Sequence, residues 1–249
     1  MSDVLQTILS HKSVRSFTSE RLTEEQIKEL VAAAQAASTS SFLQAYSIIG
    51  VSDPLVKKEL STYAGSQEYV VNNGHFFVFC ADFYRHKEMA NNLRADISET
   101  IQGTEALLIG TIDASLAAQN LAIAAESMGL GICYIGGLRN NLAGVSASLG
   151  APAHVLPLFG IAVGYPEKVN EKKPRLPFGS VYHENRYNVD KGLLNAQLEE
   201  YDRTIQSYYV DRTENTRKTT WTEQATDKLR IPKRVYMKDF ITQKGWAKH

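Results

Sequence analysis

The sequence has little cysteine and no excess of charge of either sign. Its 249 residues include two cysteines, Cys80 and Cys133, and each lies in an apolar run typical of a buried strand, which argues against a disulfide framework. Lys and Arg total 27, and Asp and Glu also total 27, so no overall field recruits nucleic acid or an anionic membrane surface. Any anionic ligand must therefore be bound by a local group of side chains.

The signatures of several other protein classes are also missing. The N-terminus lacks the basic start, apolar stretch and cleavage site of a secretory signal, so we expect a cytoplasmic protein. None of the 6 histidines stands at metal-ligand spacing from a cysteine or another histidine, and we predict no metal site. A Gly-x-Ser-x-Gly elbow and a Walker loop are absent as well, so no motif of that kind competes for the function.

Hydrophobic periodicity predicts an irregular alternation of helices and strands. We expect helices over about 24–37, 54–64, 105–128 and 142–149, and strands over 46–51, 76–81, 130–135 and 156–163. Thr23 and Gln26 fit a capping box for the first of these helices. The long apolar stretch from about Ala106 to Met128 is interrupted by polar residues, including Asp113 and Glu126, so it is a poor membrane span and a good buried helix.

The composition changes near Leu193, where charged and aromatic residues begin to spread along amphipathic stretches. Such large apolar rings need a surface to cover, either on the same subunit or on a second one. We therefore predict a core of residues 1–192 and a helical C-terminal extension of residues 193–249.

Two basic segments could bind a phosphate. The run His11-Lys12-Ser13-Val14-Arg15 places three cation-capable side chains and a hydroxyl within five residues, and Lys172-Lys173-Pro174-Arg175 carries cations in a loop that proline stiffens. A solvated basic turn and an ordinary connecting loop are the alternatives. A third cluster, Arg212 with Asn215, Arg217 and Lys218, could meet a second phosphate-bearing ligand or could be a solvated helix face.

Two further segments offer hydroxyl and backbone groups. In 38–44, hydroxyls and an amide flank Phe42, and the alternative is a polar loop with that ring tucked into the core. In 134–140, Gly136 and Gly137 follow a strand and would let backbone N–H groups approach a ligand, or they form an ordinary turn. This segment lacks the dinucleotide-binding Gly-x-Gly-x-x-Gly spacing.

Taken together and in this order, the motifs resemble the nitroreductase family, in its branch of NADPH-dependent flavin reductases and oxygen-insensitive nitroreductases. The resemblance covers nearly the whole chain, through the segments 11–15, 38–44, 124–131, 134–140, 154–160 and 173–177 to Trp221. It implies an α+β fold in which a central antiparallel sheet is flanked by helices, and an interlocked homodimer with FMN sites at the interface. Residues 1–192 would then be the FMN-binding core, with the extension packing on the core and on the partner subunit.

The resemblance also assigns residues to the ligands. The FMN phosphate and ribityl chain would be held by His11, Lys12, Ser13, Lys173 and Arg175, with Arg15 beside the isoalloxazine pyrimidine edge. The flavin would also meet Thr39, Ser40, Ser41, Gln67, Tyr134, Ile135, Gly136 and Gly137. NADPH or the acceptor would meet Phe42, Glu105, Arg212, Asn215 and Arg217. Lys12 replaces an arginine usual in the family, which keeps the charge but loses the bidentate fork.

The function implied is ping-pong, two-electron reduction of nitroaromatics, quinones or free flavin by NADPH through bound FMN. The flavin carries the chemistry, so no catalytic side chain is demanded, and Arg15 is the electrostatic contributor. One alternative is a dedicated NADPH:FMN reductase that supplies reduced flavin to another enzyme. An alternative of another class is a flavin-binding redox sensor without turnover. The small-molecule acceptor is not identified by the sequence.

Overall fold

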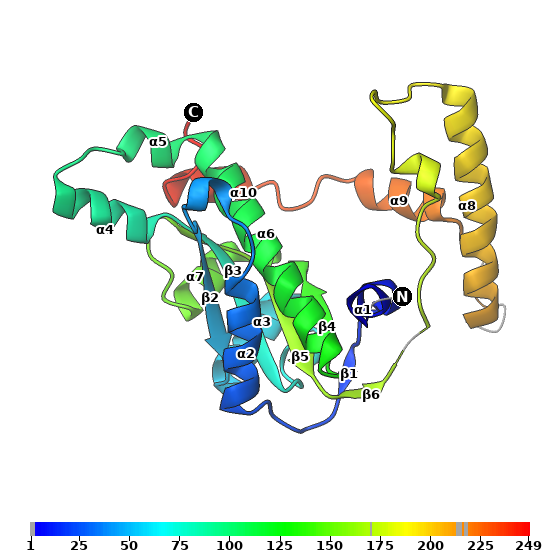
Figure 1. Cartoon of the computed structure of the whole chain (residues 1–249), viewed down its shortest axis with the longest axis horizontal. Helices are drawn as coiled ribbons and strands as arrows, with labels where there is room; N and C mark the ends of the chain where they lie inside the picture. The colour runs from blue at the N-terminus through cyan, green and yellow to red at the C-terminus, as the bar shows by residue number, and fades with distance from the viewer. Residues whose placement is uncertain (1–2, 170, 213–215, 217–218) are drawn as a thin grey trace. The chain divides into compact units, whose positions relative to one another are not determined.

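The computed structural model describes all residues except 1–2, 170, 213–215 and 217–218 (Figure 1). It divides into two compact units, one of residues 1–170 with 234–249 and one of residues 171–233. These bounds differ from the predicted 192/193 boundary, because residues 171–190 group with the helices that follow and the last residues return to the first unit. The division into an FMN-binding core and an extension stays a prediction.

A four-stranded antiparallel sheet forms the centre of the first unit, as expected. Its strand order is β2 (Tyr46–Val51), β3 (His75–Asp82), β5 (Val155–Gly164) and β4 (Gly131–Ile135). Every residue of β3 is buried, because neighbouring strands flank it and helices cover both faces of the sheet. A separate two-stranded ribbon pairs β1 (Ser16–Phe17) with β6 (Pro166–Lys168).

The alternation of side chains along β3 separates two hydrophobic clusters. Phe77 and Phe79 belong to the cluster that includes residues of α2 (Glu24–Gln35) and α6 (Thr104–Ser127). Phe76 and Val78 belong to the other, with residues of α3 (Pro54–Tyr63) and α7 (Leu142–Ser148). Since successive strand residues point to opposite faces, the sheet lies between two helical layers.

Most of the predicted elements are present in the first unit. The capping box of Thr23 and Gln26 begins α2, and both cysteines are buried and unpaired with each other. The remaining helices are α1 (Asp3–Ser10), α4 (Tyr84–Leu93), α5 (Ser98–Gln102) and α10 (Met237–Gln243). Helices α4 and α5 were not predicted from the sequence, since α4 carries mostly polar side chains and α5 is a single short turn.

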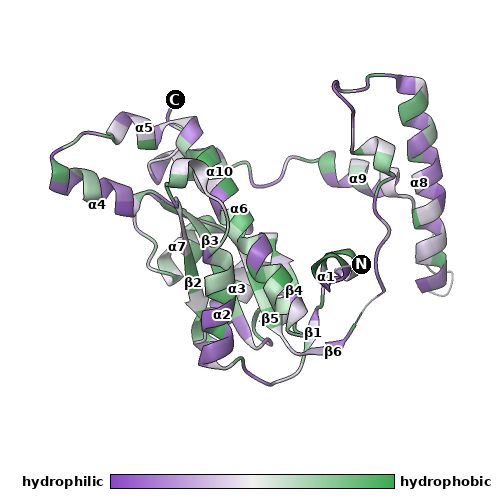
Figure 2. Ribbon diagram, in the orientation of Figure 1, coloured by the Kyte–Doolittle hydropathy of each residue, from purple (hydrophilic) through white to green (hydrophobic). Residues whose placement is uncertain are grey.

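The long apolar helix α6 lies against the sheet. A Cβ at Gly110 would stand 2.7 Å from the Cβ of Ala81, so only glycine lets the helix approach β3 this closely. Apolar residues recur along the helix (Figure 2), and by length and composition alone it could cross a membrane. Its buried face is nevertheless built of small residues that pack on other parts of the same unit, among them Ala114, Ala118 and Ala122.

The second unit is mainly helical, with α8 (Lys191–Arg212) and α9 (Trp221–Leu229). Tyr201, Ile205 and Tyr209 form its small core, against which Trp221 packs. Helices therefore occur in this part of the chain, while the extension of residues 193–249 stays a prediction. Trp246, by contrast, is completely buried in the first unit, where its ring lies 5.6 Å from that of Phe83.

Candidate functional site

The basic N-terminal motif lies beside β4. Ser13 pairs in parallel with Ile132, and the Val14 N–H donates to the Ile132 carbonyl at 2.9 Å. Val14 is buried and touches Gly131, where a Cβ would come within 2.7 Å of its side chain. One buried valine thus fixes the segment, while the neighbouring Lys12 and Arg15 are exposed and can meet a ligand.

His11 is oriented by a carboxylate on α6. Its Nδ1 donates to Glu126 Oε1 at 2.7 Å, and the Glu126 side chain is only 14% exposed. A carboxylate that accepts from one ring nitrogen fixes the ring and leaves the other nitrogen to face a ligand. In the sequence Glu126 stands out only as a polar interruption of the apolar stretch, and its role beside His11 was not predicted.

Arg15 adjoins the segment that carries Gln67. Burial raises the pKa of the Cys133 thiol, and the positive charge of Arg15 opposes that rise. Burial likewise raises the pKa of Tyr69, and Arg15 again acts in the opposite direction. Tyr69 lies in the short helix η2 (Glu68–Val70), directly after Gln67. Arg15 therefore lies close to the segment that contains Gln67.

Tyr134 links the end of β4 to α6. Its hydroxyl donates to Gln119 Oε1 at 3.3 Å, and burial together with Glu126 raises the pKa of Tyr134 to about 12. The chain then enters the short helix η3 (Gly136–Asn140). A Cβ at Gly137 would lie 2.5 Å from the Ala64 carbonyl oxygen, so packing on the end of α3 already requires glycine there. The predicted reason, close approach to a ligand, is not needed to explain Gly137.

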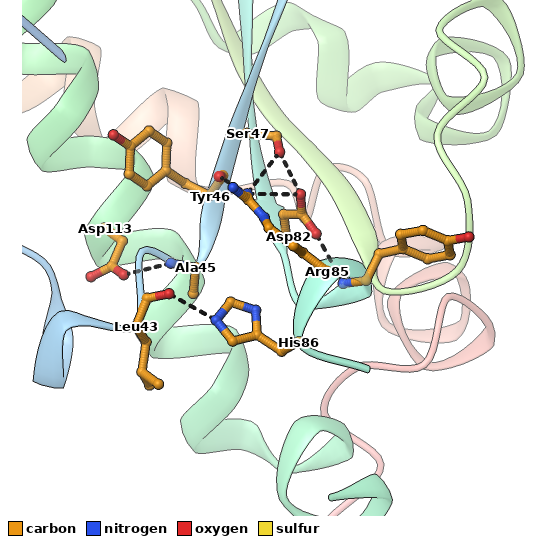
Figure 3. A network of polar contacts seen from close by, with 9 residues as sticks. Leu43, Ala45, Tyr46, Ser47, Asp82, Arg85, His86 and Asp113 are labelled. Carbon is orange, nitrogen blue, oxygen red and sulfur yellow. Dashed lines mark hydrogen bonds and ion pairs between the residues drawn. The ribbon is translucent and has the colours of Figure 1, made fainter. Parts of the chain in front are cut away.

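The hydroxyl-rich loop is tied down by a buried carboxylate. Asp113, which is fully buried on α6, accepts from the Ser40 N–H at 2.9 Å and from the Ala45 N–H at 3.0 Å. Figure 3 shows the bond to Ala45. His86 Nε2 also bonds the Leu43 carbonyl at 2.7 Å. These anchors hold three non-glycine residues at positive φ, namely Ser41 at 47°, Phe42 at 59° and Gln44 at 55°. Such backbone strain persists only where the surroundings impose it, and it gathers at binding sites.

Two side chains of this loop are candidates for contact with a ligand. Phe42 is 80% exposed, so the alternative that places its ring in the core is wrong. The Thr39 hydroxyl is buried, and no hydrogen-bond partner for it exists among the described residues. Since buried polar groups are nearly always satisfied, an exposed ring beside an unsatisfied hydroxyl favours a bound ligand at this loop.

Three of the polar contacts of α6 connect these segments. Asp113 anchors the 39–45 loop, Gln119 bonds Tyr134, and Glu126 orients His11. At 1.5 Å per residue, Asp113 and Glu126 are separated by about 20 Å along the helix. One rigid helix thus positions three of the candidate segments, at the same polar residues that interrupt its apolar run.

The remaining candidates are described separately. In the second unit, Lys173 Nζ donates to the Tyr209 hydroxyl at 2.8 Å, and Arg175 donates to the Lys173 carbonyl at 2.8 Å. Arg212 donates to the Tyr208 hydroxyl at 3.1 Å, whereas Asn215 and Arg217 lie outside the described residues. Glu105 is exposed in the first turn of α6, where a negative charge also stabilises the helix terminus.

Comparison with known proteins adds the family. The nitroreductase family model matches residues 8–165, and the model of the nitroreductase family C-terminal domain matches residues 173–249. A Bacillus subtilis protein named FMN reductase (NADPH) is 54% identical over 249 residues, which are 100% of each chain.

Solved structures agree. The NfrA1 nitroreductase from B. subtilis has 54% identity and a TM-score of 0.97, and the match covers 99% of this chain and 100% of that one. The NADPH:FMN oxidoreductase from Vibrio harveyi, complexed with NAD+, has 40% identity and a TM-score of 0.90 over 100% of both chains.

Proposed function

The chain belongs to the nitroreductase family, and on that premise we propose that it is an FMN-dependent enzyme that reduces nitroaromatics, quinones or free flavin with NADPH. The observation that carries the proposal is full-length similarity, at 54% identity, to a protein named FMN reductase (NADPH). The predicted α+β fold with its antiparallel sheet agrees with this assignment.

The residues present fit FMN. The Thr39 hydroxyl is a hydrogen-bonding group without a partner in the part of the chain that the structure describes, and the strained loop presents Ser40 and Ser41 next to it in the sequence. His11, Lys12 and Ser13 supply donors that suit a phosphate, and we assign Lys173 and Arg175 to the same group. Gln67, Tyr134, Ile135, Gly136 and Gly137 complete the proposed contacts. Bound FMN supplies the chemistry by accepting hydride from NADPH and passing two electrons to the acceptor.

The chain's own residues prepare this site. Arg15 places a fixed positive charge where the ring becomes more negative on reduction, and fixed charges in a preorganised site need no reorganisation during reaction. Glu126 holds the His11 ring, and Asp113 holds the loop that carries Thr39 and the serines. We assign exposed Phe42 to the acceptor side, and Glu105, Arg212, Asn215 and Arg217 to NADPH.

We also propose that the protein is a cytoplasmic homodimer. The exposed face of α6 carries Leu108, Ile112 and Leu116, which are 51%, 53% and 44% exposed and follow one another at four-residue spacing. An apolar stripe of this kind on a long helix is the usual sign of a partner surface. Burial of the stripe against a second copy accounts for a helix that is apolar nearly all round.

The direct test is turnover. Purified, FMN-loaded protein should oxidise NADPH in the presence of a nitrofuran or a quinone. Failure with every such acceptor and with free FMN would overturn the proposal.

A dedicated FMN reductase is the second candidate, favoured by the name of the B. subtilis relative. The two candidate functions are distinguished by comparing kcat/KM for free FMN with kcat/KM for a nitrofuran or a quinone. A strong preference for FMN favours the dedicated reductase, and comparable values favour the broader enzyme.

A further inference from the structure

An open cavity of about 740 Å³ lies in the first unit, and none of the residues assigned to FMN or NADPH lines it. Its wall comes from the segment after β1, the start of α3 and the turn before β3. Phe17, Leu22 and Ile27 supply apolar surface, whereas Arg21 and Lys57 supply positive charge. The volume falls in the range of sites that take small organic molecules.

Lys57 is a buried cation without a carboxylate partner. It is 7% exposed, and its Nζ donates to Asn73 Oδ1 at 2.8 Å and to the Asn73 carbonyl at 3.4 Å, both of them neutral groups. Within the described part of the chain, none of the ion pairs within 4.0 Å involves Lys57. Buried lysines are normally paired with a carboxylate, so the Lys57 ammonium group lacks the counter-charge that is usual for a buried lysine.

The other charged groups near Lys57 do not supply the missing negative charge. Burial, followed by the positive charge of Arg21, lowers the pKa of Lys57 to about 8. Glu24 also lines the cavity, but its carboxylate is 93% exposed and pairs with Lys28 at 3.8 Å. It therefore does little to neutralise the two cations on the wall.

His75 is a second buried polar side chain on this wall. It is 9% exposed, it lines the same cavity, and its buried Nε2 has no hydrogen-bond partner among the described residues. Burial and then the charge of Lys57 lower the pKa of His75 to about 4, so the ring is neutral at neutral pH. A neutral imidazole can donate one hydrogen bond from Nε2 without adding charge.

We propose that this cavity is a second ligand site, which binds a small organic acid through a phosphate or carboxylate oxyanion at Lys57 and Arg21. The oxyanion supplies the counter-charge that Lys57 lacks, and the neutral His75 ring on the same wall adds no competing charge. The apolar side chains that also line the cavity, Phe17 and Leu22, contact the body of the ligand. The residues of this site are distinct from those assigned to FMN and NADPH.

The test follows Lys57 directly, in FMN-loaded protein labelled with ¹³C at lysine Cε and assigned through Lys57→Met. Inorganic phosphate and acetate are the two probes, and sodium chloride at the same ionic strength is the control. A bound oxyanion should raise the proton affinity of Lys57 by roughly tenfold or more, because an opposite charge at this distance stabilises the ammonium form. Neighbouring Lys58, which is exposed, should not respond in this way.

Each outcome decides the proposal. A response to phosphate alone identifies a phosphate ligand, and a response to acetate alone identifies a carboxylate. Arg21→Met should by itself raise the pKa of Lys57, since it removes a repelling charge, and should abolish the further response to the probe. If neither probe changes the titration of Lys57 beyond the change caused by chloride, the second ligand site does not exist.

Discussion

Arg15 is an exposed cation set beside buried neighbours. Its charge acts on the Cys133 thiol and on the Tyr69 hydroxyl, both of which burial drives toward the protonated form. Arg15 therefore has two neutral neighbours, a thiol and a phenol, and its side chain remains exposed to solvent. That arrangement suits a residue whose charge is directed at a ligand.

Replacing Arg15 by glutamine should therefore affect chemistry more than folding. We expect hydride transfer from NADPH to bound flavin to slow by about 10²-fold, the usual cost of losing one electrostatic contact in a preorganised site. Stopped-flow absorbance of the flavin measures the rate under anaerobic conditions. Arg15→Lys keeps the charge and should retain most of the rate. An unchanged rate in a fully FMN-loaded Arg15→Gln variant would remove Arg15 from the mechanism.

His75 makes stability depend on pH. Its pKa is lowered from 6.5 to about 4 in the folded protein, so the unfolded chain binds the proton more readily. Stability is therefore complete above about pH 6.5 and is lost as the pH falls toward 4. His75→Asn should reduce the loss between pH 7 and pH 5 by about 2 kcal/mol. Urea unfolding at both pH values, with excess FMN present, measures this difference, and equal losses in both proteins would contradict the assignment.

At the scale of elements, α6 shows what a sequence can and cannot reveal. Periodicity predicted a buried helix over 105–128, and the helix spans Thr104–Ser127. The same sequence showed Asp113 and Glu126 as interruptions of an apolar run. It could not show that Asp113 bonds Ser40, 73 residues away, or that Glu126 bonds His11, 115 residues away, because such pairings exist only after the chain folds.

Asp113 offers the clearest test of this scaffold. In Asp113→Asn, one of the two backbone N–H groups must face an amide NH2 instead of an oxygen. Because that donor is buried, the free energy of unfolding should fall by about 1–3 kcal/mol. FMN affinity should fall as well, since the strained loop loses an anchor. Urea unfolding and FMN titration measure the two effects.

Asp96→Asn is the matched control. Asp96 also accepts a backbone N–H, that of Ser98 at 2.9 Å, but in an exposed position. Asp96→Asn should therefore lower the free energy of unfolding by less than Asp113→Asn does, and it should leave FMN binding unchanged. Equal effects of the two substitutions would show that the buried carboxylate has no special role.

At the scale of the whole molecule, the sequence predicted the sheet and its main helices. It did not predict the bounds of the two compact units. Trp246 illustrates the reason, because both it and Trp221 stand in polar stretches near the end of the chain, yet Trp246 is buried in the first unit while Trp221 packs in the second. Composition shows that a ring needs cover, but only the fold shows which surface provides it.

The proposed dimer depends on the apolar stripe of α6. Ile112→Glu places a charge at the middle of Leu108, Ile112 and Leu116 and should convert the dimer to monomer, since desolvating an unpaired carboxylate is costly. Sedimentation velocity measures the state of association. Leu55→Glu is the control, because Leu55 is also exposed, at 73%, but lies on α3. A dimer that survives Ile112→Glu would place the interface elsewhere.

The claim that the protein is an FMN-dependent NADPH oxidoreductase is tested by an absorbance scan of the purified protein, followed by anaerobic addition of NADPH and, separately, NADH. We expect flavin bands that NADPH bleaches rapidly. A colourless protein that cannot be reconstituted with FMN would contradict the claim, and flavin that neither nucleotide bleaches would favour the redox sensor instead.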